Sequence, residues 1–125
     1  MTIALWCVLI AAILPLVLVG ISRAGQRYDN RDPRGASQAL EGSRKRAHSA
    51  HLNAFEAFPF FAAAVIVAEM KGAPRGALDG LAVAFIIVRI VHAGAYLGDQ
   101  APLRSAIWTV GFLLTIGIFI LPLWR

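Results

Sequence analysis

Two groups of polar side chains lie in otherwise apolar parts of the chain and could form a binding or catalytic site. Asn53 and Glu56 are three residues apart, while Arg89, His92 and Tyr96 follow an i, i+3, i+7 spacing. On a helix, each spacing places its members on one face. Amide, carboxylate, guanidinium and imidazole groups form strong hydrogen bonds with charged partners, so the pattern favours an anionic, peptide-like or carboxylate ligand.

The apolar surroundings of these residues indicate that a helix bundle shelters them. A charged side chain at the middle of a membrane helix costs on the order of 2.5–3.5 kcal/mol even on insertion scales. If the two helices end near Ala47 and Gly98, Glu56 and Arg89 both lie about 13 Å from those ends at a rise of ~1.5 Å per residue. The sequence therefore predicts an ion pair between Glu56 and Arg89.

An isolated ion pair that fixes helix register is the simplest structural explanation for these two charges. The pattern, however, contains more polar groups than such a pair requires. The additional candidates, which would form a donor-rich pocket open to the cytoplasm, are Arg46, Asn53, His92, Tyr96 and Arg104. We therefore expect a ligand-binding site rather than a purely structural pair.

Four apolar segments predict that these residues belong to a membrane protein. Hydrophobic residues make up 58% of the chain and the mean hydropathy is +0.68, whereas about half of a soluble domain is apolar. The predicted helices cover about residues 2–22, 46–70, 78–98 and 104–124, and each is long enough for a ~30 Å hydrocarbon core. A cleaved signal peptide is the alternative for the first segment, but basic residues follow it rather than precede it. We expect one domain over residues 1–125, an all-α bundle of four transmembrane helices.

The charges outside these helices indicate how the chain crosses the membrane. The net charge is +5, and most Lys and Arg residues lie between the first two helices, from Arg23 to Arg46. By the positive-inside rule, this connection and the one that precedes Arg104 are cytoplasmic, and both termini are outside. Topology, with anionic-lipid contact second, explains the basic charge without a nucleic-acid partner. Charges beside the second turn, such as Glu69 and Arg75, are expected to be solvated.

Two observations argue against metal binding. Cys7 is the only cysteine, so a cysteine-based metal framework cannot form. His48 and His51 are three residues apart, but no carboxylate accompanies them at ligand spacing. No metal site is predicted.

Two longer motifs resemble signatures of a known family. The stretch 46–60, which contains Asn53 and Glu56, resembles the second-helix signature of the membrane-associated proteins in eicosanoid and glutathione metabolism, MAPEG. The stretch 89–98, followed by Ala-Pro-Leu-Arg-Ser at 101–105, is similar to the third-helix and loop signature of the prostaglandin E synthase and microsomal glutathione transferase branch. The resemblance covers essentially the whole chain. The compact length of the chain favours a prokaryotic member of the family.

The resemblance implies a homotrimer of four-helix subunits in a membrane, the inner or plasma membrane if the source is bacterial. Glutathione would bind between neighbouring subunits near the cytoplasmic side and react with a lipophilic substrate. Arg104 is the first choice and Ser105 the second for stabilising the thiolate, whose unperturbed pKa is near 8.5. The predicted glutathione-binding residues are Arg23, Arg46, Asn53, Glu56, Arg89, His92 and Tyr96.

The sequence departs from the family pattern at one position and leaves more than one function open. Many members have an Arg four residues before the Asn, where this chain has Ser49, and Arg46 is the candidate substitute. The leading hypothesis is a glutathione-dependent transferase or peroxidase that acts on a lipophilic electrophile. The alternative is a non-catalytic binding protein of the same fold that presents a lipid or small anion at the subunit interface. A proton-driven exporter is disfavoured because the segment 2–21 has no carboxylate.

Overall fold

Four long helices form the protein in the computed structural model, which describes residues 1–24 and 31–124. The elements are α1 (Ile3–Arg23), α2 (Pro33–Gln38), α3 (Gly42–Met70), α4 (Arg75–Leu97), α5 (Ala101–Ile120) and the 3-10 helix η1 (Leu121–Trp124). Within the described residues, α1, α3, α4 and α5 with η1 are long and apolar enough to cross a membrane. The predicted all-α bundle of four membrane helices is confirmed.

Three helices begin earlier than hydropathy indicates. α3 begins at Gly42, so basic residues that were expected in the connection belong to its first turn. α4 begins at Arg75, and α5 begins at Ala101 with Pro102 in its first turn. Proline is tolerated there because the first-turn N–H groups have no intrahelical acceptor. Hydropathy locates the lipid-facing part of a helix and misses the polar turns that extend beyond it.

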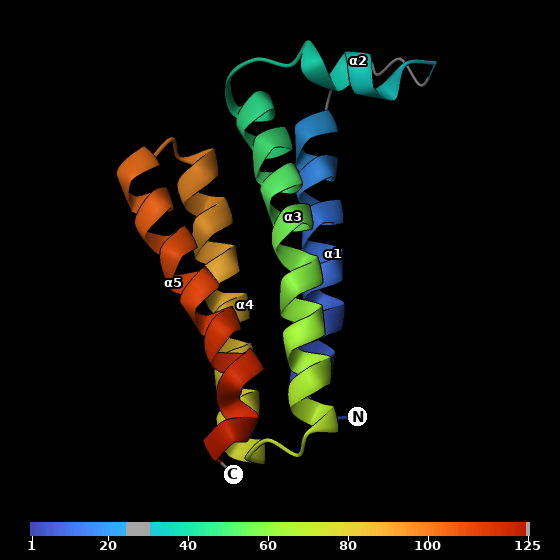
Figure 1. The fold of residues 1–125 in the computed structure, drawn as a ribbon. Helices are drawn as coiled ribbons and strands as arrows, with labels where there is room; N and C mark the ends of the chain where they lie inside the picture. The colour runs from blue at the N-terminus through green and yellow to red at the C-terminus, as the bar shows by residue number, and fades with distance from the viewer. Residues whose placement is uncertain (25–30, 125) are drawn as a thin grey trace.

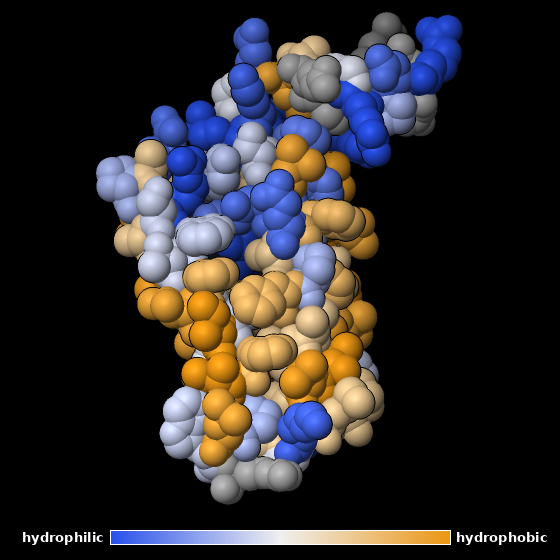
Figure 2. All heavy atoms as spheres, in the orientation of Figure 1, coloured by the Kyte–Doolittle hydropathy of each residue, from blue (hydrophilic) through white to orange (hydrophobic). Residues whose placement is uncertain are grey.

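The four helices pack as two pairs (Figure 1). α1 lies beside α3, and α4 lies beside α5, with both chain termini at the end of the bundle opposite α2. The pairs meet closely at this terminal end and separate toward the end that carries α2, called the basic end below. Figure 2 shows hydrophilic side chains concentrated at the basic end and a largely apolar surface along the rest of this face.

The apolar core lies mainly in the terminal half of the bundle. Small residues such as Ala4, Ala64 and Ala82 are fully buried and let the helix backbones approach one another, as is common in membrane bundles. The rings of Phe61 on α3 and Phe85 on α4 stack with their centroids 4.0 Å apart. Close packing therefore holds the two helix pairs together in the terminal half of the bundle, before they diverge toward the basic end.

Polar contacts also join the helices at the terminal end. Arg75 Nη1 and Nη2 donate hydrogen bonds to the two carboxylate oxygens of Glu69 at 2.8 and 2.6 Å. Thr2 Oγ1 donates to Glu69 as well, and the Ala4 N–H donates to Asp79 Oδ1 at 2.9 Å. Arg75 is exposed, as expected for a solvated charge, whereas Glu69 and Asp79 are only partly exposed. The charges also form a network that links α1, α3 and α4, which was not expected.

Candidate functional site

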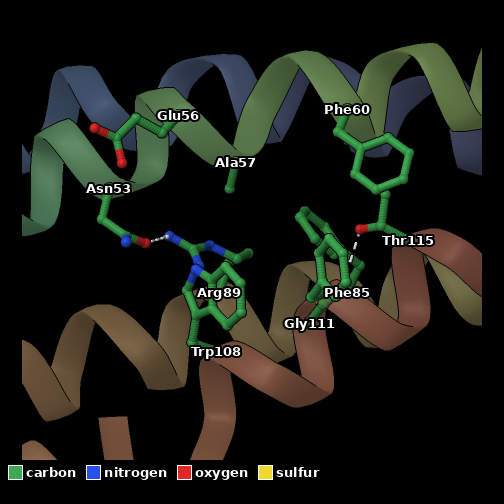
Figure 3. Close-up of a pocket in the computed structure, with 10 residues that line it drawn as sticks. Asn53, Glu56, Ala57, Phe60, Phe85, Arg89, Trp108, Gly111 and Thr115 are labelled. Carbon is green, nitrogen blue, oxygen red and sulfur yellow. Dashed lines mark hydrogen bonds between the residues drawn. The ribbon is translucent and has the colours of Figure 1, made fainter. Parts of the chain in front are cut away.

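Arg89 is the buried cation at the point where the two helix pairs begin to separate. Its residue is 4% exposed, and its Nη2 atom donates a hydrogen bond to Asn53 Oδ1 on α3 at 2.6 Å (Figure 3). A guanidinium has five N–H donors, so this single contact leaves most of its capacity unused. Among the described residues, no carboxylate lies within 4.0 Å of Arg89. The site therefore contains a buried positive charge that an anionic ligand can neutralise.

The predicted ion pair between Glu56 and Arg89 is wrong. Glu56 is exposed, and Figure 3 shows its carboxylate pointing away from the guanidinium. Arg89 lies level with Asn53, which is one helical turn nearer the basic end than Glu56. The prediction assumed that Glu56 and Arg89 lie at equal depths, but the packing of α4 on α3 sets a different register. Glu56 and Arg89 nevertheless line one pocket together, which is described below.

A polar pocket of about 350 Å³ lies between α3, α4 and α5 at the basic end. Its lining residues are Asn53, His92, Tyr96, Arg104, Ser105, Trp108 and Thr109. The structure thus brings together five of the predicted site residues, two of which are the candidates for thiolate stabilisation.

Contacts between side chains inside this pocket fix the position of its cationic residue, Arg104. The guanidinium carbon of Arg104 lies 4.4 Å from the ring centroid of Tyr96, a cation–π contact that links α5 to α4. The rings of His92 and Tyr96 are in a T-shaped arrangement with 5.9 Å between their centroids. His92 is 2% exposed, and within the described part of the chain its Nδ1 atom has no hydrogen-bond partner. A buried polar atom without a partner is uncommon and is consistent with a site that a ligand completes.

An apolar pocket of about 200 Å³ adjoins the polar one (Figure 3). The two pockets share Asn53 and Trp108 as lining residues. The remaining lining residues of the apolar pocket are Glu56, Ala57, Phe60, Phe85, Arg89, Gly111, Phe112 and Thr115. The second pocket is therefore mainly apolar, but it also contains two charged residues of the predicted site, Glu56 and Arg89, and it adjoins the other predicted polar groups.

The α5 side of the apolar pocket is absent from the residues predicted by sequence. Trp108, Gly111, Phe112 and Thr115 belong to no motif that suggests chemistry. A signal did exist, since Ser105, Trp108 and Phe112 follow i, i+3, i+7 spacing and must share a face of the helix. Extending the face of the candidate catalytic residues along α5 would have identified this wall.

Two predicted glutathione-binding residues lie outside both pockets. Arg46 Nε donates a hydrogen bond to the backbone carbonyl of Leu97 at 3.1 Å, which joins the start of α3 to the end of α4. Arg23 lines a separate hollow of about 510 Å³ between α1, α2 and α3, together with residues such as Arg34 and His48. The structure of the single chain does not bring either residue to Arg104.

Comparison with known proteins agrees with this architecture. The sequence pattern described as MAPEG family matches residues 3–124. No curated protein and no solved structure matches the chain. Because the family match covers nearly the whole chain and four helices can span a bilayer, the chain is an integral membrane protein that belongs to the MAPEG family, whose members generally use glutathione.

Proposed function

We propose that the protein is a glutathione-dependent transferase or peroxidase that acts on a lipophilic electrophile from the membrane. The observation that carries this proposal is the junction of the two pockets at Asn53 and Trp108. At such a junction, a charged peptide and an apolar molecule can be in contact with each other. The peptide is not fully exposed to lipid, and the apolar molecule is not fully exposed to water. Membership of the MAPEG family supports glutathione as the charged partner.

The polar groups of the site complement the groups of glutathione. Glu56 would bind the ammonium group, and the side chain of Asn53 would bind a peptide group. Arg89, His92 and Tyr96 would donate to carboxylates or carbonyls, which also neutralises the buried charge of Arg89. The ligand would therefore stabilise the protein as well as bind to it.

Arg104 is the proposed thiolate-stabilising residue, with Ser105 as the second candidate. A nearby cation favours the charged form of a thiol and lowers its pKa from about 8.5 toward neutrality. In a transfer reaction, a carbon–sulfur bond forms, the leaving group departs with its electron pair, and the thiol proton goes to water. In a peroxidase reaction, sulfur attacks the terminal peroxide oxygen to form a sulfenic acid, and the other oxygen leaves as an alkoxide that takes up a proton. The thiol of a second glutathione then attacks the sulfenic sulfur, the S–O bond breaks, and the disulfide and water are released.

The proposal includes a homotrimer with both termini outside and the basic end in the cytoplasm. Glu56 is exposed in a single subunit, and a neighbouring copy would cover this costly charge within the bilayer. Arg23 lies on a different side of α3 from the two pockets, so its contact with glutathione would come from a neighbouring subunit. The topology rests on the positive-inside rule, and a bacterial inner or plasma membrane is the proposed location.

The test is to measure binding and turnover separately with purified protein in nanodiscs. Calorimetry with glutathione measures binding, and absorbance with a nitroaryl halide or an organic hydroperoxide measures turnover. We expect saturable glutathione binding and turnover of at least one electrophile. Absence of both binding and turnover in a folded oligomer would overturn the proposal.

A non-catalytic binding protein is the second candidate function. It is favoured by Ser49, which replaces the usual Arg, and by the engagement of Arg46 with Leu97, which leaves that loss uncompensated within the subunit. The same measurements distinguish the two functions. Binding of glutathione or of an anionic lipid without any turnover would favour the second.

A further inference from the structure

The guanidinium group of Arg104 is held by an aromatic ring and not by an anion. Its Cζ atom lies over the ring of Tyr96, 4.4 Å from the ring centroid. Among the described residues, no carboxylate lies within 4.0 Å of Arg104, and its side chain donates no hydrogen bond. Contact with the face of a ring uses none of the five N–H donors of a guanidinium. The cation is therefore held in place while its charge and its donors remain available.

An acidic partner would also hold a guanidinium, but it would neutralise the charge. Arg75 at the terminal end shows this arrangement, since it donates to both carboxylate oxygens of Glu69 at 2.8 and 2.6 Å. A cation paired in this way stabilises a further anion less, because the carboxylate repels that anion. An aromatic ring attracts the cation through its quadrupole and carries no net charge. The partner thus decides whether an arginine stabilises the fold or a bound anion.

The turn between α4 and α5 fixes where the ring and the guanidinium meet. The N–H of Gln100 donates to the Ala95 carbonyl at 2.9 Å, and the N–H of Asp99 donates to the Tyr96 carbonyl at 3.2 Å. With Asp99 in the left-handed conformation at φ 58°, these two bonds form a Schellman motif. The N–H of Arg104 then donates to the Gln100 carbonyl at 2.8 Å. The backbone from one side chain to the other is therefore tightly hydrogen-bonded, which limits their relative motion.

We infer that the ring of Tyr96 positions Arg104 with its charge uncompensated, and that this arrangement is what allows Arg104 to favour the thiolate of bound glutathione. The thiol proton goes to water, as in the proposed function. Tyr96 then has two separable roles, because its hydroxyl would bind glutathione while its ring acts through Arg104 as a positioning group. The inference rests on the proposed function, since it explains how the same site is regulated toward the thiolate.

The variants Tyr96→Phe and Tyr96→Leu separate these two roles. Both lack the hydroxyl, so both should bind glutathione more weakly in calorimetry, but only Tyr96→Leu lacks the ring. The ultraviolet absorbance of bound thiolate, followed across a pH series, should show about tenfold less thiolate at neutral pH in Tyr96→Leu, because the cation is no longer fixed beside the thiol. The value of kcat at saturating glutathione should fall in parallel and recover at high pH. Tyr96→Phe should keep the wild-type pH profile, and the same shift in both variants, or in neither, would overturn the positioning role.

A new carboxylate beside Arg104 tests whether its charge must stay uncompensated, without changing Tyr96. Ala101 is exposed in the first turn of α5, and Ala101→Glu would place a carboxylate three residues before Arg104 on the same helix face. We expect the thiolate fraction at neutral pH to fall about twofold or more, because such a pair partly neutralises the cation. Ala101→Gln has the same shape without the charge and should keep the wild-type fraction. Equal fractions in the two variants would overturn this part of the inference, including in the case that Tyr96→Leu does not fold.

A double-mutant cycle separates the inference from the proposed function, because it requires no ligand. The melting temperatures of Tyr96→Leu, Arg104→Ala and the double variant are compared with that of the wild type in nanodiscs. If the ring holds the guanidinium, the two single effects should not add, since either change removes the same contact. Additive effects would overturn the inference even if glutathione binds. If the wild type bound no glutathione, the proposed function would fail, while non-additive effects would still support Tyr96 as the group that holds Arg104.

Discussion

The two ends of the bundle use similar charged side chains in opposite ways. At the terminal end, Glu69 accepts two hydrogen bonds from Arg75 and one from Thr2, and Asp79 accepts the Ala4 N–H. The three helices that meet there are fixed relative to one another. Polar groups that pair with one another in this way stabilise a structure and have less capacity left for a ligand.

At the basic end, the polar groups have unused hydrogen-bonding capacity. Among the described residues, Arg89 makes one hydrogen bond, to Asn53, and Glu56 makes none. The buried His92 Nδ1 has no partner in the described part of the chain. A site that must bind and release a charged ligand requires such incomplete pairing, because each internal partner would have to be displaced. The terminal end therefore supplies the stability that allows the basic end to remain open.

The largest expected effect that tests this contrast is loss of activity in Arg104→Ala. Removing a cation that stabilises a developing or bound thiolate typically costs about 100-fold or more in rate. We expect such a loss in kcat, with at least about tenfold weaker glutathione binding, measured by absorbance and calorimetry. Arg104→Lys retains the charge but not the planar stacking on Tyr96, and it should recover part of the rate. Wild-type rates in Arg104→Ala would remove Arg104 from the mechanism.

The next effect is weaker glutathione binding in Glu56→Gln. Because Glu56 has no partner in the described residues, the substitution should leave the melting temperature unchanged and reduce affinity about tenfold by removing the ion pair with the ligand. Glu41→Gln is the matched control, since Glu41 is an exposed carboxylate before α3 and lines none of the pockets. A lower melting temperature with unchanged affinity would mean that Glu56 has a structural role instead.

A smaller, purely structural effect is expected for Glu69→Gln. Loss of the charge-assisted bonds with Arg75 should lower the melting temperature by roughly 4 °C, while glutathione affinity stays at the wild-type value. Differential scanning fluorimetry and calorimetry measure the two quantities. Opposite responses of Glu56→Gln and Glu69→Gln in the same two assays would establish the division between the ends. If Glu69→Gln instead weakened glutathione binding with no thermal effect, that division would be incorrect.

The sequence predicts the four membrane helices well because long apolar runs are a strong and local signal. It also identifies most of the polar pocket, since Asn53, His92 and Tyr96 lie at helical spacings that do not depend on packing. The pairing of Arg89 with Asn53 rather than Glu56 could not be predicted in this way. Both candidates lie on the same face of α3, one turn apart, and only the register between α3 and α4 decides which one Arg89 reaches.

Arg46 illustrates the same limit and gives the smallest expected effect. Sequence places it near the site, but its Nε atom donates to the carbonyl of Leu97, at a helix end whose carbonyls have no intrahelical donor. Such a bond contributes about 0.5–1.5 kcal/mol net to stability.

Arg46→Gln should therefore lower the melting temperature slightly and change glutathione affinity by about twofold or less. The neighbouring Lys45→Gln, which removes the same charge at an exposed position, is the control. If Arg46→Gln weakened glutathione binding as strongly as Glu56→Gln does, Arg46 would be a ligand contact after all. Its free Nη groups would then compensate for the arginine that Ser49 replaces, and the catalytic function would gain support over the binding-only one.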